Sequence, residues 1–281
     1  MQIFKKQTDL KAYLKLVSDI NSTIGLVPTM GALHQGHLTL LEESLKNNST
    51  TVISVFVNPT QFNNQEDLEK YPRTLDEDIL KIKKISETII VYAPSVDDIY
   101  QGNTTSIAFD FDGLENQMEG KFRPGHYDGV GTIVKKLFEI IQPTNAYFGE
   151  KDFQQLQIVK KMVEKLKLPI KIIGCPIFRD SNGLAMSSRN KRLSAIEKKE
   201  AALIYKTLKQ AKIRFETQSA TSVSAWVSKI FQSHPNFKLE YFQIADEKHL
   251  LPCKQKTVGN NYRAFIAVFV NDIRLIDTIP F

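Results

Sequence analysis

Short apolar runs alternate with amphipathic stretches through residues 1–178, and this alternation limits the fold more than any other feature of the sequence. The apolar runs span residues 24–27, 51–57, 88–92, 145–148 and 170–173. Continuous apolar runs of this length are typical of parallel strands buried on both faces. The stretches between them that have helical periodicity span residues 36–47, 75–86, 129–141 and 153–166. The pattern therefore predicts an α/β fold with a doubly wound, Rossmann-like parallel sheet.

The pattern changes after residue 178. Helical periodicity covers residues 194–215 and 219–231, and strand-like runs follow at 237–245, 263–270 and 273–276. Asn271 and Asp272 separate the last two runs, as expected of a tight hairpin turn. We expect two domains: residues 1–178 as a catalytic domain, and residues 179–281 as a smaller α+β domain that closes over its site.

Charge and cysteine content limit the classes of function. The 281-residue chain has a formal charge of +6, but its lysines occur in scattered pairs, which favours solvated helix faces over a nucleic-acid-binding patch. Two cysteines, Cys175 and Cys253, are too few for a disulfide scaffold. No apolar run approaches the ~18 residues of a membrane span, and the first residues lack a signal-peptide core. We expect a cytoplasmic protein that binds neither membrane nor nucleic acid.

The segment from Pro28 to Leu38 directly follows the first apolar run and leads into a helical stretch. Gly31 and Gly36 let the backbone approach a ligand closely, and a helix start favours phosphate. His34 and His37 lie beside that helix start and are suited to hold ATP phosphates and to donate hydrogen bonds during displacement of pyrophosphate. Taken alone, the motif fits a capped turn with two surface histidines equally well.

Polar residues follow two further apolar runs. Asn58 and Gln61 present uncharged amides, which suit a small hydroxylated carboxylic acid, although Asn-Pro is more often only a turn. Lys151 follows Gly149 and is a natural point charge for phosphate, whereas Asp152 suits a ribose hydroxyl or a cation. Gln155 is four residues beyond Lys151 and shares its helix face. Acidic capping of a helix is the alternative, but it does not explain the lysine.

Two loops complete the candidate site. Ser187, Ser188 and Arg189 are suited to close over a triphosphate and to stabilise departing pyrophosphate, although a bare Ser-Ser-Arg is otherwise typical of a flexible linker. The glycine-rich segment 118–131 is suited to wrap a substrate or to form a dimer contact. The acidic run 76–78 favours a helix start over a metal cage. A P-loop, a zinc-spaced Cys/His set and a nucleophilic serine elbow are all absent from the sequence.

In combination, these segments closely resemble the pantothenate synthetases, AMP-forming pantoate–β-alanine ligases of the nucleotidyltransferase superfamily that includes class I aminoacyl-tRNA synthetases. The matching segments, in order, are 28–38, 58–62, 119–131, 149–155 and 180–190. They cover most of the first domain and the junction, whereas the last hundred residues carry little signature. The segment Met186 to Arg189 is similar to the K-M-S-K-S loop of the synthetases, with arginine in place of lysine.

The resemblance implies that pantoate and ATP give pantoyl adenylate and pyrophosphate, and that β-alanine then displaces AMP to yield pantothenate, with Mg²⁺ required and a cytoplasmic homodimer typical. It implies catalytic roles for His34, His37, Lys151, Ser187, Ser188 and Arg189. The ATP-binding residues that it implies are Met30, Gly31, Ala32, Leu33, His34, Gln35, Gly36, His37, Gly149, Glu150, Lys151, Asp152, Phe178, Met186, Ser187, Ser188 and Arg189. Pantoate is implied at Gln61 and Gln155 with Asn58 in support, and β-alanine beside Gln61.

The resemblance also implies that His37 is a proton donor. A carboxylate that attacks phosphorus needs no acid, however, so electrostatic stabilisation of the transition state is the simpler role for His37. One alternative is a nucleotidyltransferase that acts on a phosphorylated acceptor. Uncharged Asn58, Gln61 and Gln155 disfavour it, because a phosphate calls for more arginine or lysine. The other alternative is an RNA-binding module, which needs a basic face and exposed stacking aromatics.

Overall fold

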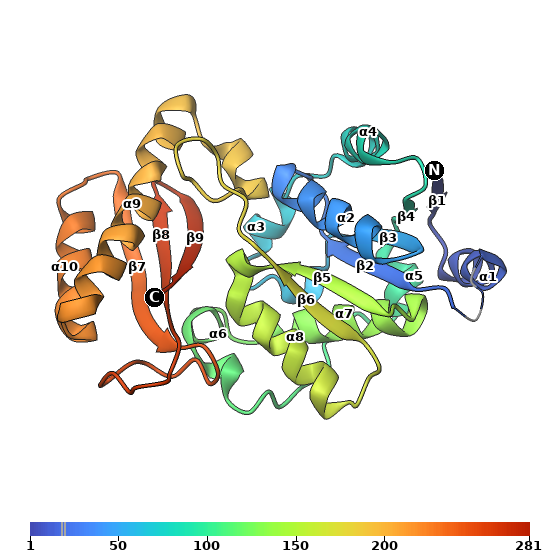
Figure 1. The fold of residues 1–281 in the computed structure, drawn as a ribbon. Helices are drawn as coiled ribbons and strands as arrows, with labels where there is room; N and C mark the ends of the chain where they lie inside the picture. The colour runs from blue at the N-terminus through green and yellow to red at the C-terminus, as the bar shows by residue number, and fades with distance from the viewer. Residues whose placement is uncertain (18, 20) are drawn as a thin grey trace.

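The computed structural model describes residues 1–17, 19 and 21–281. In these residues, six parallel strands form one sheet in the order β1-β4-β3-β2-β5-β6 (Figure 1). The strands are β1 (Gln2–Phe4), β2 (Ile24–Thr29), β3 (Thr50–Val55), β4 (Ile90–Tyr92), β5 (Asn145–Gly149) and β6 (Lys171–Cys175). The predicted doubly wound sheet is confirmed: the five expected strands begin and end within two residues of their expected places, and β1 is an additional strand that the sequence did not predict.

Neighbouring residues of the central strands enter two different hydrophobic clusters. Leu26 and Val52 face one cluster, whereas Val27 and Ile53 face another, and all four are fully buried. A strand that is covered on both faces must be apolar at consecutive positions, which explains the unbroken apolar runs of the sequence.

Helices cover both faces of this sheet. Side chains of α2 (Gln35–Asn47) and α4 (Leu75–Ile85) fill one cluster. The other cluster contains residues of α1 (Gln7–Val17), α5 (Val96–Tyr100), α7 (His126–Ile141) and α8 (Phe153–Lys165). The shorter elements are α3 (Gln65–Glu69), α6 (Met118–Phe122) and the 3₁₀ turns η1 (Pro59–Gln61), η2 (Leu114–Asn116), η3 (Glu150–Asp152) and η4 (Ser188–Arg192).

The strand order reverses at β2. From β2 the chain moves outward through β3 and β4, then returns to place β5 on the opposite side of β2. In open α/β sheets, ligands bind beyond the carboxyl ends of the strands at such a reversal. The segments after Thr29 and Gly149 begin there, so the topology brings two of the predicted site segments together.

The C-terminal part folds around a separate antiparallel sheet in the order β7-β8-β9. Its strands are β7 (Phe237–Asp246), β8 (Tyr262–Val270) and β9 (Ile273–Pro280), and its helices are α9 (Ala195–Thr217) and α10 (Ala220–Gln232). Asn271 adopts a φ of 51° in the turn between β8 and β9, which confirms the predicted hairpin. Both helices pack on this small sheet, as Figure 1 shows.

The other face of the small sheet packs against the first sheet's helices. The rings of Phe153 in α8 and Phe265 in β8 lie 6.1 Å apart, and Phe265 belongs to the larger hydrophobic cluster. Figure 1 shows α6 between the two sheets. The division after residue 178 stays a prediction; it falls just beyond β6, in a segment where Arg179 pairs with Ala185 in an isolated β-bridge.

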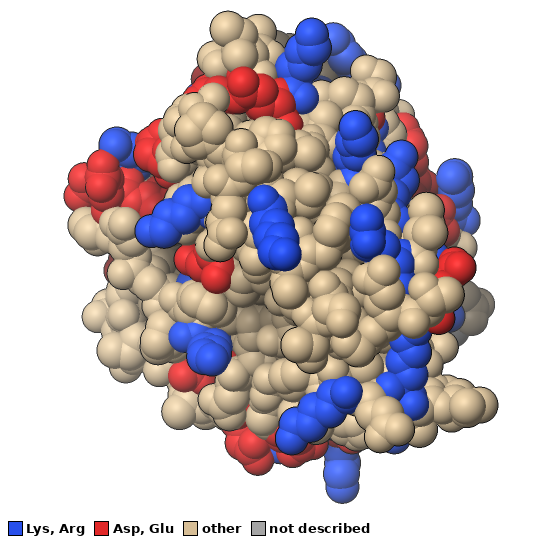
Figure 2. Space-filling view, turned by 90° about the vertical axis from the view of Figure 1, so that its left-hand side faces the viewer, with Lys and Arg blue, Asp and Glu red and all other residues tan. Residues whose placement is uncertain are grey.

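Charged side chains are dispersed over the face that Figure 2 presents. Lysine and arginine stand singly over the middle of this face, several lie near one another toward its right-hand side, and acidic side chains are interspersed with them. None of the helices in the described ranges is long and apolar enough to cross a membrane.

Candidate active site

The segment after β2 turns sharply into α2. Thr29 fixes the turn, because its hydroxyl donates to the Ser54 carbonyl (2.7 Å) and accepts from the amide of Gly31 (3.2 Å). Gly31 and Ala32 then adopt φ values of 80° and 51°. A glycine suits the first of these positions, because a side chain there would be strained and would press on Val55. The turn carries the chain to the first residue of α2.

A buried carboxylate holds this turn from α4. Asp78 is fully buried and accepts hydrogen bonds from the amides of Ala32 (2.8 Å) and Leu33 (2.7 Å). Lys81, one turn further along α4, donates to the Leu33 carbonyl (2.8 Å). The sequence correctly predicts that the acidic run 76–78 begins a helix, but it gives no sign that the third carboxylate supports the turn 46 residues away.

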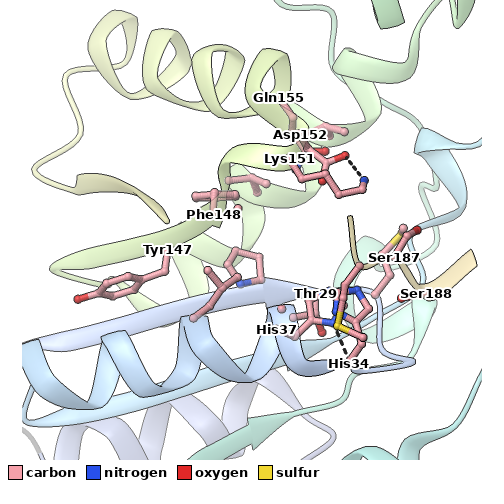
Figure 3. Close-up of a pocket in the computed structure, with 18 of the residues that line it drawn as sticks. Thr29, His34, His37, Tyr147, Phe148, Lys151, Asp152, Gln155, Ser187 and Ser188 are labelled. Atoms are coloured by element: carbon pink, nitrogen blue, oxygen red, sulfur yellow. Dashed lines mark hydrogen bonds and ion pairs between the residues drawn. The ribbon is translucent and has the colours of Figure 1, made fainter. Parts of the chain in front are cut away.

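The two histidines stack at the start of α2, with ring centroids 3.9 Å apart (Figure 3). The Nδ1 of His37 accepts a hydrogen bond from the His34 amide (3.3 Å), so the proton of a neutral His37 ring lies on Nε2. Burial lowers the pKa of His37 to about 4, and the charges of Lys151 and Lys81 add to this while Asp152 opposes it. Burial and His37 lower the pKa of His34 to about 2. Both rings are neutral hydrogen-bond donors near pH 7.

The segment after β5 faces these rings. Lys151 and Asp152 follow Gly149 in η3, and the ammonium of Lys151 lies 3.5 Å from the Asp152 carboxylate. Figure 3 shows this pair and Gln155, from the first turn of α8, across the pocket from His34 and His37. The segments that follow β2 and β5 therefore line the same cavity.

Asn58 and Gln61 form a third side of the site. Asn58 is almost fully buried and donates to the side-chain oxygen of Gln61 (3.2 Å). The Tyr100 hydroxyl donates to the Asn58 oxygen (2.5 Å), which fixes the orientation of the amide. Asn58 also donates to the carbonyl of Gly129 (3.1 Å), where a Cβ would lie 2.3 Å from the Thr60 carbonyl oxygen, so glycine is needed for this close approach. Asn58 thus orients Gln61.

The loop 186–189 reaches the site from the C-terminal side. The Ser188 hydroxyl donates to the carbonyl of Ala32 (3.0 Å), which joins this loop to the turn before α2. The Arg189 guanidinium lies 2.7 Å from the Asp67 carboxylate and above the Tyr71 ring. Ser187 caps η4 by accepting from the Arg189 amide.

These segments enclose a cavity of about 220 Å³ that adjoins a second of about 430 Å³, and residues such as Gln61, Lys151 and Arg189 line both. The predicted site residues that line the first cavity are Met30, His34, Gly36, His37, Asn58, Gln61, Gly149, Lys151, Asp152, Gln155, Phe178, Met186, Ser187, Ser188 and Arg189.

Five predicted ATP-binding residues do not line either cavity: Gly31, Ala32, Leu33, Gln35 and Glu150. The first three form the turn that Asp78 holds, and the Glu150 carboxylate lies 3.4 Å from the Arg263 guanidinium. Conversely, the sequence analysis did not single out the apolar wall that α7 supplies. Val130, Ile133, Val134 and Leu137 line the cavity, but their helical spacing is equally typical of a core.

A family model described as pantoate–beta-alanine ligase matches residues 2–280. The chain belongs to the pantoate–beta-alanine ligase family. It is therefore an enzyme, a ligase of pantoate and beta-alanine, as the five sequence segments predict. A pantothenate synthetase of Flavobacterium psychrophilum is 64% identical over 279 residues, which cover 99% of each chain.

Solved structures agree with this membership in the ligase family. A pantothenate synthetase from Thermus thermophilus superposes with a TM-score of 0.90 at 36% identity and covers 99% of each chain. A pantoate–beta-alanine ligase from Francisella tularensis, described as complexed with beta-gamma ATP and beta-alanine, superposes with a TM-score of 0.81 at 33% identity, over 100% of this chain and 97% of that one. The predicted α/β fold with a small C-terminal domain matches these ligases.

Proposed function

We propose that the chain joins D-pantoate to β-alanine in two steps at the cavity between α2, η3 and the loop 186–189. In the first, a pantoate carboxylate oxygen attacks the α-phosphorus of ATP, the bond to the bridging oxygen breaks, and pyrophosphate leaves. In the second, the β-alanine nitrogen attacks the acyl carbon, AMP leaves, and the nitrogen releases a proton. The observation that carries the proposal is the neutral pair His34 and His37, opposite Lys151 and beside the uncharged amide of Gln61.

The triphosphate is proposed to lie over the start of α2. Amide groups and the helix dipole there favour an anion. The Nε2 proton of His37 and the ammonium of Lys151 line the same cavity and can donate to the charge that develops on the α-phosphate. Because the pKa of His37 is lowered to about 4, a neutral donor and not an acid is the role that fits at pH 7. Ser187, Ser188 and Arg189 are proposed to stabilise the leaving pyrophosphate.

Mg²⁺ is proposed to be held chiefly by the phosphates. Among the described residues, no group of three His, Cys, Asp or Glu side chains is arranged to hold a metal ion. Asp152 lines the cavity with its side chain 45% exposed and is the carboxylate suited to contact the ion or its waters. Bound Mg²⁺ neutralises phosphate charge.

Pantoate is proposed to lie between the amides and α7. Gln61 and Gln155 offer donors and acceptors to its hydroxyl and carboxylate groups. The apolar side chains of Val130, Ile133 and Val134 suit its dimethyl carbon. An acceptor that carries a phosphate would be less well matched by this apolar wall. β-Alanine is proposed to reach the adenylate beside Gln61, from the adjoining larger cavity.

A cytoplasmic homodimer is proposed on the resemblance alone.

The reaction itself is tested by incubating the protein with ATP, Mg²⁺, D-pantoate and β-alanine, and measuring products by mass spectrometry. We expect AMP, pyrophosphate and pantothenate in equal amounts. A second incubation replaces D-pantoate and β-alanine with phosphorylated acceptors. AMP conjugates that form only in this second incubation would instead support the alternative nucleotidyltransferase reaction.

A further inference from the structure

The short helix α6 carries a buried carboxylate that the proposed chemistry does not use. Glu119 receives two parallel hydrogen bonds from the Arg274 guanidinium of β9 (2.8 and 2.7 Å). The Tyr241 hydroxyl of β7 donates to the same carboxylate (2.7 Å). The C-terminal sheet therefore supplies the partners of a side chain that belongs to the first part of the chain.

The positive charge of Arg274 stabilises the buried carboxylate of Glu119 in its ionised form. Burial by itself raises the pKa of Glu119, but the hydrogen bonds and charge of Arg274 outweigh it and lower the pKa to about 2. Arg274 also donates to Glu240 of β7 (2.9 Å), which lies beyond the intervening strand β8. Two-point guanidinium–carboxylate pairs fix orientation as well as distance, and a buried carboxylate that loses its partner is strongly destabilised.

The same segment reaches the substrate side of the site. Arg123, the C-cap residue of α6, donates to the backbone carbonyl of Gln61 (3.3 Å). The Nδ1 of His126 lies 2.8 Å from that same carbonyl, and the Nε2 of His126 lies 3.2 Å from the Arg123 guanidinium. A further link runs back to Glu119, whose carboxylate is 3.7 Å from Arg123. The backbone of Gln61 is thus held by residues that follow Glu119 within one turn or two.

We propose that the Glu119–Arg274 ion pair is a positioning device that couples the C-terminal sheet to Gln61 and so sets affinity for pantoate. The inference rests on the proposed function, in which Gln61 holds pantoate. Arg274 and Glu119 both line the larger cavity, so the pair also forms part of the wall beside Gln61. Movement of β9 relative to α6 would disturb the amide that holds pantoate more than the turn that holds ATP, because the latter is fixed by Asp78 from α4.

The test compares Arg274→Gln, Glu119→Gln and the double variant in steady-state kinetics. We expect Arg274→Gln to raise KM for pantoate by about tenfold or more and KM for ATP by less than about threefold. The double variant is expected to recover part of this loss, because Glu119→Gln removes the charge that Arg274→Gln leaves unpaired. Arg274→Lys keeps the charge but not the two-point geometry, and is expected to fall in between. Lys165→Gln, which removes an exposed ion pair with Asp110 at the end of α8, is the matched control.

Equal rises in both KM values, or a fall in melting temperature with unchanged KM values, would overturn the proposal. If Arg274→Gln does not fold, Arg274→Lys carries the same comparison. Amide hydrogen exchange of residues 58–62, followed by mass spectrometry, separates this proposal from the proposed function. Faster exchange there in Arg274→Gln than in Lys165→Gln is expected even if pantoate is not the substrate, and unchanged exchange would contradict the coupling.

Discussion

Two loops from different parts of the chain meet at the site, and they are held in different ways. The turn 30–37 is fixed by the buried carboxylate of Asp78, which accepts from two backbone amides. The loop 186–189 is fixed partly through the Arg189–Asp67 ion pair, whose side chains remain 26% and 28% exposed. Ser188 joins the two loops by one hydrogen bond.

This difference divides the site into two halves. The turn 30–37 is the preformed half, and the loop 186–189, whose Arg189 can exchange its partner, is the exchangeable half. Amides that are paired with a buried carboxylate cannot exchange that partner for water without a large cost. A partly exposed ion pair contributes less to stability than a buried one, and its guanidinium can exchange a carboxylate for a phosphate. We infer that the turn before α2 is ready for ATP, whereas Arg189 is available to leave Asp67 when pyrophosphate forms.

The largest effect is expected at the preformed half. Replacing His37 with Ala removes the neutral donor that we propose to lie beside the α-phosphate, and losing one such donor typically costs at least ~10²-fold in rate. Adenylate formation is measured as pantoate-dependent ATP–pyrophosphate exchange, and circular dichroism checks that the fold is retained. Undiminished exchange in a folded variant would remove His37 from the mechanism.

The next effect separates support from chemistry. Asp78→Asn leaves one of the two buried backbone amides facing an NH2 group, which cannot accept its hydrogen bond, and this costs about 1–3 kcal/mol. We expect a melting temperature several degrees lower and a rise in KM for ATP of about tenfold. Asp76→Asn, on the exposed side of the same helix turn, is the control and should match the parent enzyme. Equal behaviour of the two variants would mean that the turn does not depend on the buried carboxylate.

Acid should weaken the preformed half through its buried histidines. The pKa values of His34, His37 and His126 are lowered to about 2, 4 and 3, mainly by burial. Between pH 6.5 and about 4 the unfolded chain therefore binds protons that the folded chain does not, so stability falls as pH falls. Each histidine contributes about 1 kcal/mol per pH unit in this window.

Melting temperatures measured from pH 7.5 to 5 check this dependence. His126→Gln should reduce the slope of melting temperature against pH by about one third. Replacement of the exposed His234 with Gln is the control and should leave this slope unchanged. A parent enzyme whose stability is level across this range would show that the rings titrate in the folded state as they do in the unfolded chain, which contradicts the lowered pKa values.

The smallest effect is expected at the exchangeable half. Asp67→Asn releases Arg189 from its carboxylate, and we expect KM for ATP to fall by no more than about threefold with the melting temperature unchanged. Steady-state kinetics at low ionic strength measure this. A loss of activity comparable to that of Asp78→Asn would contradict the distinction between the two loops.

The sequence predicts what depends on local pattern. Unbroken apolar runs identify the central strands, and the positions of His34, Lys151 and Gln61 after such runs place them at one edge of the sheet. Short elements with few buried residues are not predicted in this way. The strand β1 has three residues, and α1 has only two buried residues, Leu10 and Leu14. The pattern in these segments is too short to be distinguished from loop.

Polar contacts between residues far apart in the sequence are also not predicted by local pattern. Asp78 is one of three adjacent acidic residues, and nothing local distinguishes the one that reaches Ala32 and Leu33. The pairing of Glu119 with Arg274 spans 155 positions and depends on how two sheets pack. Val130 and Ile133 have the spacing of a core helix, so their place in the cavity wall becomes visible only once η1 is packed beside α7.

The most direct test of the central claim is ATP–pyrophosphate exchange with Mg²⁺ and D-pantoate, in the absence of β-alanine. The proposed mechanism predicts exchange that requires pantoate and that gives way to net pantothenate and AMP formation once β-alanine is added. A folded protein that binds ATP but shows no pantoate-dependent exchange would contradict the adenylate mechanism and direct attention to phosphorylated acceptors.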